Sequence, residues 1–175
     1  MMLHGREPVK ALRKPMELCF RPPVPAKPRM VDFHELPSSV FSRKIYNVLQ
    51  PMNIYGLQFL PATVRRKKDA RYEDYWVTYV YNRIACLDVE HSQYDIDEDD
   101  GDISNILRFF LDKEKLAEIP LEKRLVFLLA EGMSRRIYHK SIVDDVMPAN
   151  PVRIQFYPIQ EWYEGIQFDD EEEDW

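Results

Sequence analysis

The stretch YWVTYVYNRIACLDVE, residues 75–90, decides the fold. Its first seven residues are all aromatic or β-branched, as strands prefer, and they alternate between two faces with the period of an extended chain. One face carries Tyr75, Val77, Tyr79 and Tyr81, and the other carries Trp76, Thr78 and Val80. After a short break, a second strand is predicted from Ile84 to Glu90. Its buried face would hold Ala85, Leu87 and Val89, and its polar face Cys86, Asp88 and Glu90.

The segment before these strands predicts a helix followed by a short strand. Ser38 and Ser39 are candidate caps for a helix of about ten residues that ends near Pro51. The apolar residues at helical spacing are Phe41, Ile45 and Val48. Leu57 to Leu60 then predicts a strand, which Pro61 either terminates or confines to a sheet edge.

The second half of the chain predicts further strands and one more helix. The elements are an acidic loop over Tyr94–Asp102 with a turn at Asp100-Gly101, strands over Ile106–Leu111 and Leu125–Leu129, a helix capped by Ser141 and a strand over Ile154–Tyr157. Leu125–Leu129 is continuously apolar, which is typical of a central strand covered on both sides. The order of elements predicts an α+β protein with a mainly antiparallel sheet and a few short helices.

An internal repeat pairs Phe41–Val64 with Tyr138–Glu161 at a shift of 97 residues and without gaps. The identical pairs are Ile45 with Ile142, Pro51 with Pro148, Asn53 with Asn150, Gln58 with Gln155, Phe59 with Phe156 and Pro61 with Pro158. Both copies predict a helix, a turn marked by proline and a strand, so two related helix-strand units are expected to share one core. Chance similarity between two amphipathic segments is the alternative.

Charge and proline content divide the chain of 175 residues into three parts. Residues 1–36 are predicted to form a basic arm, because six of the thirteen prolines fall before residue 29 and proline favours extended chain. Residues 37–168 are expected to form one domain, since a hydrophobic content of 45% is enough for a core. Residues 169–175 form an acidic tail, which either is a solvated chain end or attracts a basic partner.

The composition also predicts a compartment and excludes some ligands. Cys19 and Cys86 imply no disulfide framework. Leu3–Lys14 is interrupted by charges and by Pro8, so no secretory signal is predicted, and no apolar run approaches the roughly 20 residues of a membrane span. A cytoplasmic protein without a membrane partner is expected. The net charge of −6 argues against nucleic acid as a ligand, because phosphates need clustered cations on a folded face.

No group of side chains predicts catalysis or a cofactor. The carboxylates that resemble the start of a calcium loop are Asp95, Asp97 and Asp99. Asp100 replaces the glycine that such a loop needs, and Ile106 replaces its closing glutamate. The four histidines lack zinc-type spacing, and Cys86 and His91 would face opposite sides of a strand. A protein without enzymatic activity, metal or cofactor is predicted, and an enzyme with an unrecognised carboxylate site is the alternative.

Three stretches of the chain resemble one bacterial protein family. They are GLQFLPATV at residues 56–64, YWVTYVYNRIACLDVEHSQY at residues 75–94 and RIQFYP at residues 153–158. The family is the eleventh immunity family of bacterial polymorphic toxin systems, formerly a domain of unknown function, and the resemblance covers residues 37–165.

The resemblance implies a cytoplasmic antidote that is encoded beside a secreted toxin and blocks that cognate toxin by binding it. Many such toxins are basic nucleases or related enzymes, so an acidic inhibitor would be attracted to them over a long range. The acidic loop is the predicted contact surface, with Trp162 and Tyr163 as aromatic anchors. Its carboxylates are Asp95, Asp97, Glu98, Asp99, Asp100 and Asp102. A non-enzymatic interaction or scaffold protein of another pathway is the alternative function.

Overall fold

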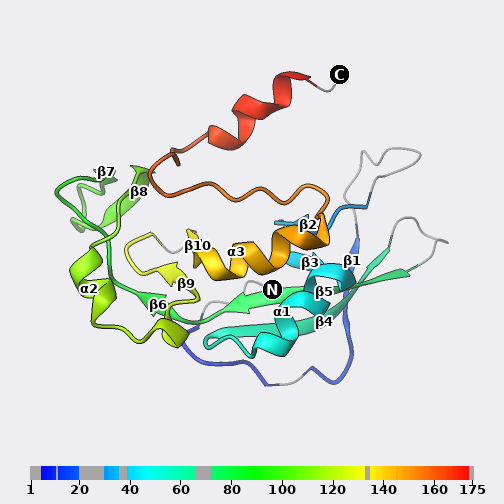
Figure 1. The fold of residues 1–175 in the computed structure, drawn as a ribbon. Helices are drawn as coiled ribbons and strands as arrows, with labels where there is room; N and C mark the ends of the chain where they lie inside the picture. Colours follow the sequence, from blue (N-terminus) through cyan, green and yellow to red (C-terminus); the bar gives the residue numbers. More distant parts are fainter. Residues whose placement is uncertain are drawn as a thin grey trace.

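The computed structural model describes residues 5–10, 12–19, 30–35, 39–65, 72–132 and 135–173. These residues form a large sheet, a smaller sheet, a separate hairpin and several short helices, which confirms the α+β class (Figure 1). Helices α1 (Arg43–Leu49) and α3 (Lys140–Val146) lie over one face of the large sheet, and the N-terminal chain passes along its other face.

The large sheet has the strand order β1-β4-β5-β3-β2. Its strands are β1 (Met16–Cys19), β2 (Phe33–His34), β3 (Val40–Ser42), β4 (Leu57–Arg65) and β5 (Tyr72–Val80). β1 runs parallel to β4, and the other neighbours are antiparallel. The strand predicted at Tyr75–Tyr81 is confirmed as β5, which ends one residue earlier and is central. Its two faces serve two core clusters, because Val77 packs in one and Val80 in the other.

β4 is longer than predicted, because Pro61 neither ends it nor confines it to an edge. Pairing with β5 covers the whole of Leu57–Arg65. The Thr78 N–H donates to the Ser39 carbonyl (2.8 Å), so alternate residues of β5 bond away from β4, and Trp76 opposite Pro61 is one of them. The N–H that Pro61 lacks therefore costs no hydrogen bond with β5, and β1 begins to pair only one residue later.

The smaller sheet has the strand order β10-β9-β6. Its strands are β6 (Arg83–Ile84), β9 (Val126–Leu129) and β10 (Arg136–Tyr138). The central strand predicted at Leu125–Leu129 is confirmed as β9. The strand predicted from Ile84 to Glu90 is wrong beyond Ile84, because the chain leaves the sheet there. Its predicted pattern is wrong as well, since Cys86 is fully buried whereas Ala85 and Val89 are exposed.

The acidic segment is half strand and half turn. β7 (Gln93–Ile96) and β8 (Ile103–Arg108) form an antiparallel hairpin, so the prediction of a loop over Tyr94–Asp102 is wrong for its first residues. The strand predicted at Ile106–Leu111 begins and ends three residues earlier. A turn at Asp100-Gly101 is confirmed, with Gly101 at a φ of +77°.

The helical elements are short. They are α1, α2 (Lys113–Ala117), α3 and the 3₁₀ turns η1 (Gln50–Met52), η2 (Leu121–Lys123), η3 (Met147–Ala149) and η4 (Ile166–Glu173). The helix predicted before Pro51 is confirmed as α1 and η1, but Phe41 belongs to β3 and Ser42, not Ser39, is the N-cap. The alternative cap, Ser38, lies outside the described residues.

The internal repeat reappears as two copies of one backbone path. α1 and η1 lead to Asn53 at a φ of +47°, and α3 and η3 lead to Asn150 at a φ of +50°. All these bounds differ by the same 97 residues. Two predictions for the second copy are wrong. The N-cap of α3 is His139, which accepts the Ser141 N–H at Nδ1 (3.2 Å), and Ile154–Tyr157 forms no strand.

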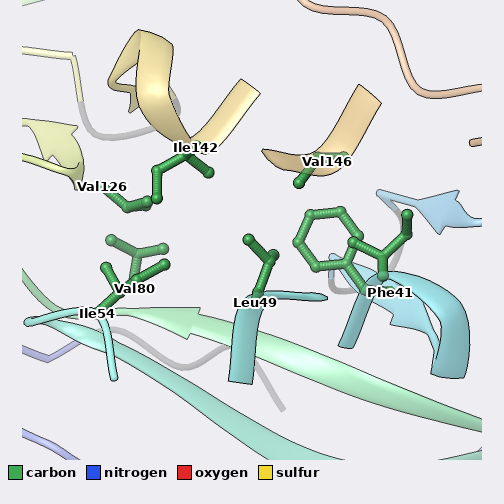
Figure 2. Close-up of a cluster of buried hydrophobic side chains, with 8 residues drawn as sticks. Phe41, Leu49, Ile54, Val80, Val126, Ile142 and Val146 are labelled. Carbon is green, nitrogen blue, oxygen red and sulfur yellow. The ribbon is translucent and has the colours of Figure 1, made fainter. Parts of the chain in front are cut away.

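The two copies meet in the first of three core clusters (Figure 2). Leu49 of α1 faces Ile142 and Val146 of α3, and all three side chains are at most 2% exposed. A second cluster joins the hairpin to the smaller sheet through Ile106 and Phe127. The third lies on the other face of the large sheet, where N-terminal residues pack on β4 and β5; they are Val9, Leu12, Met16 and Leu18.

Candidate functional site

The predicted acidic surface lies on the β7–β8 hairpin, at one end of the molecule (Figure 1). The turn between the strands is closed by the Asp97 N–H, which donates to the Asp102 carbonyl (2.8 Å). The side chains of Asp97 and Asp100 accept the N–H groups of Asp99 and Asp102, both at 2.9 Å. Two of the six predicted carboxylates therefore shape the turn. The other four are Asp95, Glu98, Asp99 and Asp102, whose side chains make no hydrogen bond to the described residues.

All six carboxylates of the hairpin are exposed. Within the described part of the chain, none of them forms an ion pair with a lysine, an arginine or a histidine. Their charges are concentrated on one turn and its flanking strand, so the surface has a strongly negative local field. A positively charged partner would be attracted to this end of the molecule.

Exposed apolar side chains lie on the same hairpin and on the chain that passes beside it. Ile96 is 56% exposed, Leu107 is 40% exposed and Tyr163 is 41% exposed. Tyr163 belongs to residues 151–165, which we call the C-terminal strap. The strap is held against β8, because the Glu164 N–H donates to the Leu107 carbonyl (2.8 Å) and the Asn105 amide donates to Glu164 Oε2 (2.7 Å). The fold therefore brings Tyr163 beside the hairpin, although about 60 residues separate them in sequence.

Trp162 is placed differently from its neighbour. Its ring lies 5.0 Å from that of Phe109, and the Arg135 guanidinium lies 4.6 Å from the ring centre. Half-buried in the second core cluster, Trp162 fixes the strap to the hairpin and presents less surface than Tyr163 does. Of the two predicted aromatic anchors, Tyr163 is the one on the open surface.

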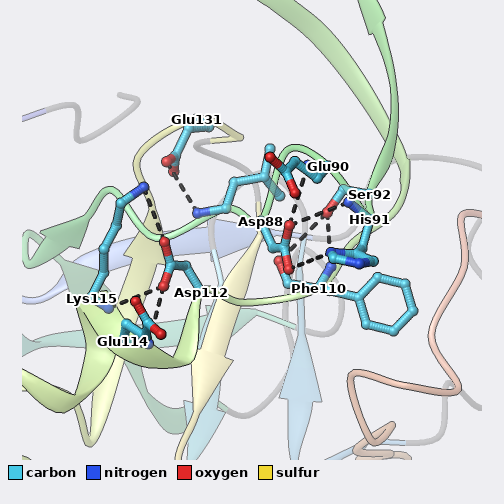
Figure 3. A network of polar contacts seen from close by, with 10 residues as sticks. Asp88, Glu90, His91, Ser92, Phe110, Asp112, Glu114, Lys115 and Glu131 are labelled. Carbon is cyan, nitrogen blue, oxygen red and sulfur yellow. Dashed lines mark hydrogen bonds and ion pairs between the residues drawn. The ribbon is translucent and has the colours of Figure 1, made fainter.

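A polar network organises the base of the hairpin (Figure 3). Asp88 Oδ1 accepts the N–H groups of Glu90 and His91, both at 3.2 Å, and Asp88 Oδ2 lies 2.9 Å from His91 Nδ1. The hydrogen bond with His91 keeps the pKa of Asp88 below its ordinary value, and the same bond raises the pKa of His91. The Phe110 N–H donates to Ser92 Oγ (2.9 Å), so the turn over residues 88–92 is tied to the chain that follows β8.

Cys86 does not resemble a nucleophile. Its side chain is 0% exposed, and burial raises its pKa to about 12, with Glu131 and Asp112 acting in the same direction. A thiol with such a pKa stays protonated near neutral pH, and the thiolate is the reactive form. The imidazole of His91 is bonded to Asp88. The structure therefore does not pair Cys86 with His91 as a base.

The three carboxylates that resemble the start of a calcium loop, Asp95, Asp97 and Asp99, do not converge on a common point. Asp95 belongs to β7, whereas Asp97 and Asp99 belong to the turn, where the Asp97 side chain is bonded to the backbone. Among the described residues, no three His, Cys, Asp or Glu side chains form a cluster that could hold a metal ion. In the same residues, no helix has the length and apolar character needed to span a membrane.

The sequence does not nominate Ile96 and Leu107. The prediction puts Ile96 inside an acidic loop and Leu107 on a strand, and it names neither residue as part of the contact surface. A signal for Ile96 exists, because it stands directly before four acidic residues and Gly101. The exposure of Leu107 depends on how the strap crosses β8, which is a tertiary effect.

Comparison with known proteins gives a family for the chain. No curated protein matches it significantly. A family model described as an immunity protein family, Imm11, matches residues 2–170. The matched region includes the repeat, both sheets, the hairpin and the strap, so it covers nearly the whole chain. The protein belongs to the Imm11 immunity protein family.

Proposed function

We propose that this immunity protein neutralises a cognate toxin by direct contact through the β7–β8 hairpin and Tyr163, without chemistry of its own. The observation that carries the proposal is that this hairpin bears both exposed carboxylates, unpaired within the described part of the chain, and exposed apolar side chains. Membership of an immunity family supplies the class of function and a toxin as the class of partner.

Charge and apolar area would have different tasks in this contact. The exposed carboxylates would attract a basic toxin and increase the association rate, because long-range attraction acts before contact. Ile96, Leu107 and Tyr163 would then lose their exposed surface on binding, which slows dissociation. A basic, nuclease-like toxin fits this arrangement, and occlusion of its working surface would be sufficient for immunity.

The proposal is tested with the toxin encoded beside the gene for this protein. The triple variant Asp95→Lys, Glu98→Lys and Asp99→Lys reverses carboxylates that make no hydrogen bond to the described residues through their side chains. We expect it to weaken toxin binding at least about 100-fold at low salt, mainly through the association rate. Binding kinetics measured at several salt concentrations, together with rescue of growth on co-expression, would show this.

A matched control reverses three exposed carboxylates elsewhere, in the variant Glu118→Lys, Glu122→Lys and Asp145→Lys. Both variants change the net charge equally, so a loss specific to the hairpin separates local contact from overall charge. Equal affinities and equal salt dependence for the two variants would show that the hairpin is not the contact surface. Growth arrest that the wild-type protein fails to relieve would reject neutralisation of this toxin.

A further inference from the structure

The internal repeat presents one backbone position twice, once bonded and once open. Tyr55 in the first copy is equivalent to Val152 in the second, since each lies two residues after the left-handed asparagine and directly before a residue with a positive φ. Val152 is bonded to Asp32, whereas Tyr55 makes no hydrogen bond to the described residues. We propose that Tyr55 and Lys123 form a binding site for an acidic residue in an extended segment of a partner protein. The proposal does not depend on the role of the hairpin.

The second copy shows what this backbone position binds. The Asp32 N–H donates to the Val152 carbonyl (3.0 Å), and the Val152 N–H donates to Asp32 Oδ2 (2.7 Å). One aspartate thus bonds to both backbone groups of Val152, through its own main chain and through its carboxylate. The negative charge is balanced by Lys44, whose Nζ lies 2.6 Å from Asp32 Oδ2. The bonded form therefore consists of a backbone position, an aspartate and a lysine.

The first copy has a lysine beside the open position. Lys123 belongs to η2, which lies next to the turn before β4 and away from the β7–β8 hairpin (Figure 1). Its Nζ is 5.8 Å from the centre of the Tyr55 ring, and the Asn82 amide fixes η2 by donating to the Lys123 carbonyl (2.7 Å). An exposed cation–π contact is weak, so this ammonium group remains available to a carboxylate, which binds it more strongly.

The charges of η2 are not neutralised within the described part of the chain. Lys123 forms no ion pair there, not even with Glu122, its neighbour in sequence. The next residue, Arg124, forms none either, and its Nε is buried without a hydrogen-bond partner among the same residues. Two adjacent cations without partners favour an occupant with an acidic side chain.

Exposed apolar surface accompanies the open position. The side chain of Tyr55 is 51% exposed, and that of Leu121 on η2 is 46% exposed. In the bonded form, Asp32 is followed by Phe33, whose ring centre lies 5.3 Å from that of Phe41. A large apolar residue beside the partner's acidic residue would similarly cover exposed surface at Tyr55. The occupant that fits best is therefore an acidic residue followed by an aromatic one.

The test uses the full chain labelled with ¹⁵N and two short peptides that are capped at both ends. One peptide has the core Val-Asp-Phe of residues 31–33, and in the other the aspartate is replaced by asparagine. We expect the amide resonance of Tyr55 to shift during titration with the Asp peptide. This peptide should bind at least about tenfold more tightly than the Asn peptide, as for one charge-assisted hydrogen bond. An unchanged Tyr55 resonance at millimolar peptide, or equal binding of the two peptides, would overturn the proposal.

Lys123→Gln is the sharpest variant, because it removes the charge and keeps most of the side chain beside Tyr55. It should weaken binding of the Asp peptide about tenfold and leave the urea unfolding midpoint unchanged. Lys113→Gln is the control, since Lys113 is exposed on α2 and forms no ion pair in the described residues. Unchanged binding by Lys123→Gln, or equal losses in both variants, would contradict a site at Tyr55. Complete displacement of the peptide by acetate at the same concentration would show that a small anion is recognised instead.

Discussion

The two copies of the internal repeat share a backbone path and then separate. Through the helix, the 3₁₀ turn and the left-handed asparagine, their bounds are equivalent residue by residue. The equivalence continues to Gly56 and Arg153, which have φ angles of +76° and +57°. After this point the first copy enters β4, whereas the second continues along the strap without forming a strand. Similar local sequence thus sets the turn, but it does not set what the chain pairs with afterwards.

The residue at the point of separation gives a physical reason for it. The Gly56 carbonyl accepts the Tyr81 N–H (2.9 Å), which begins the pairing of β4 with β5. A Cβ at position 56 would lie only 2.1 Å from Asn82 Cβ, so this approach requires glycine. Arg153 carries a Cβ and cannot approach a neighbouring backbone as closely. In addition, β9 lies between β6 and β10, so this strand has no free side with which the second copy could pair.

The largest expected effect concerns what the copies share. Ile45 is 0% exposed and Ile142 is 2% exposed, at equivalent places in the first core cluster. Ile45→Ala and Ile142→Ala should each lower the free energy of unfolding by about 2–5 kcal/mol, through lost burial and the cavity left behind. Urea unfolding followed by circular dichroism would measure both losses.

Met147→Ala serves as a control for these two variants, since Met147 is 46% exposed on η3 and should change stability by less than about 0.5 kcal/mol. A loss below about 1 kcal/mol for only one of the two isoleucines would mean that the copies do not contribute equally to the core.

A smaller effect concerns the point where the copies separate. Gly56→Ala should lower the free energy of unfolding by about 2–4 kcal/mol, because it combines a positive φ with overlap on Asn82. Arg153→Gly should change it by no more than about 1 kcal/mol, since relief of the left-handed strain is offset by the greater entropy of unfolded glycine. Thermal unfolding of both variants would compare them. A tolerated Gly56→Ala would remove close approach as the reason for the separation.

Local patterns in the sequence predict elements better than they predict pairings. Alternation identifies β5, continuous apolar character identifies β9, and the repeat identifies two related helices. The strand predicted at Ile154–Tyr157 is wrong because, although its sequence resembles that of β4, this part of the strap pairs with none of the described strands. The strand predicted at Ile84–Glu90 is wrong beyond Ile84, because the alternation that predicts a strand also occurs where the chain leaves the sheet.

For the candidate site as well, the sequence predicts the local features and misses those that depend on tertiary structure. Sequence alone identifies the acidic turn, because charge is a local property, and the six carboxylates lie together on one hairpin. It also nominates Tyr163, which only the path of the strap places beside β8. It does not nominate Leu107, because the exposure of this side chain depends on how the strap crosses β8.

The smallest effect concerns Asp32, which joins the two copies. Its carboxylate accepts from Ser42 Oγ (2.5 Å), pairs with Lys44 Nζ (2.6 Å) and accepts the Val152 N–H (2.7 Å). Asp32→Asn keeps the shape but removes the charge, so we expect a loss of about 1–3 kcal/mol in the free energy of unfolding at neutral pH. The exposed pair of Lys140 and Asp144 is the control, and Asp144→Asn should cost less than about 0.5 kcal/mol.

The pH dependence of this loss separates charge from shape. Burial opposes ionisation of Asp32, but the hydrogen bonds from Lys44, Ser42 and Val152 prevail and lower its pKa below the ordinary 3.8. The unfolded chain therefore binds a proton first as the pH falls. The stability that the carboxylate provides is complete well above pH 3.8 and is lost as the pH falls through the lower pKa of the folded state. Acid unfolding should show the wild type and Asp32→Asn converging in that range. A difference that stays constant into strong acid would mean that the copies are joined at Asp32 by packing and not by its charge.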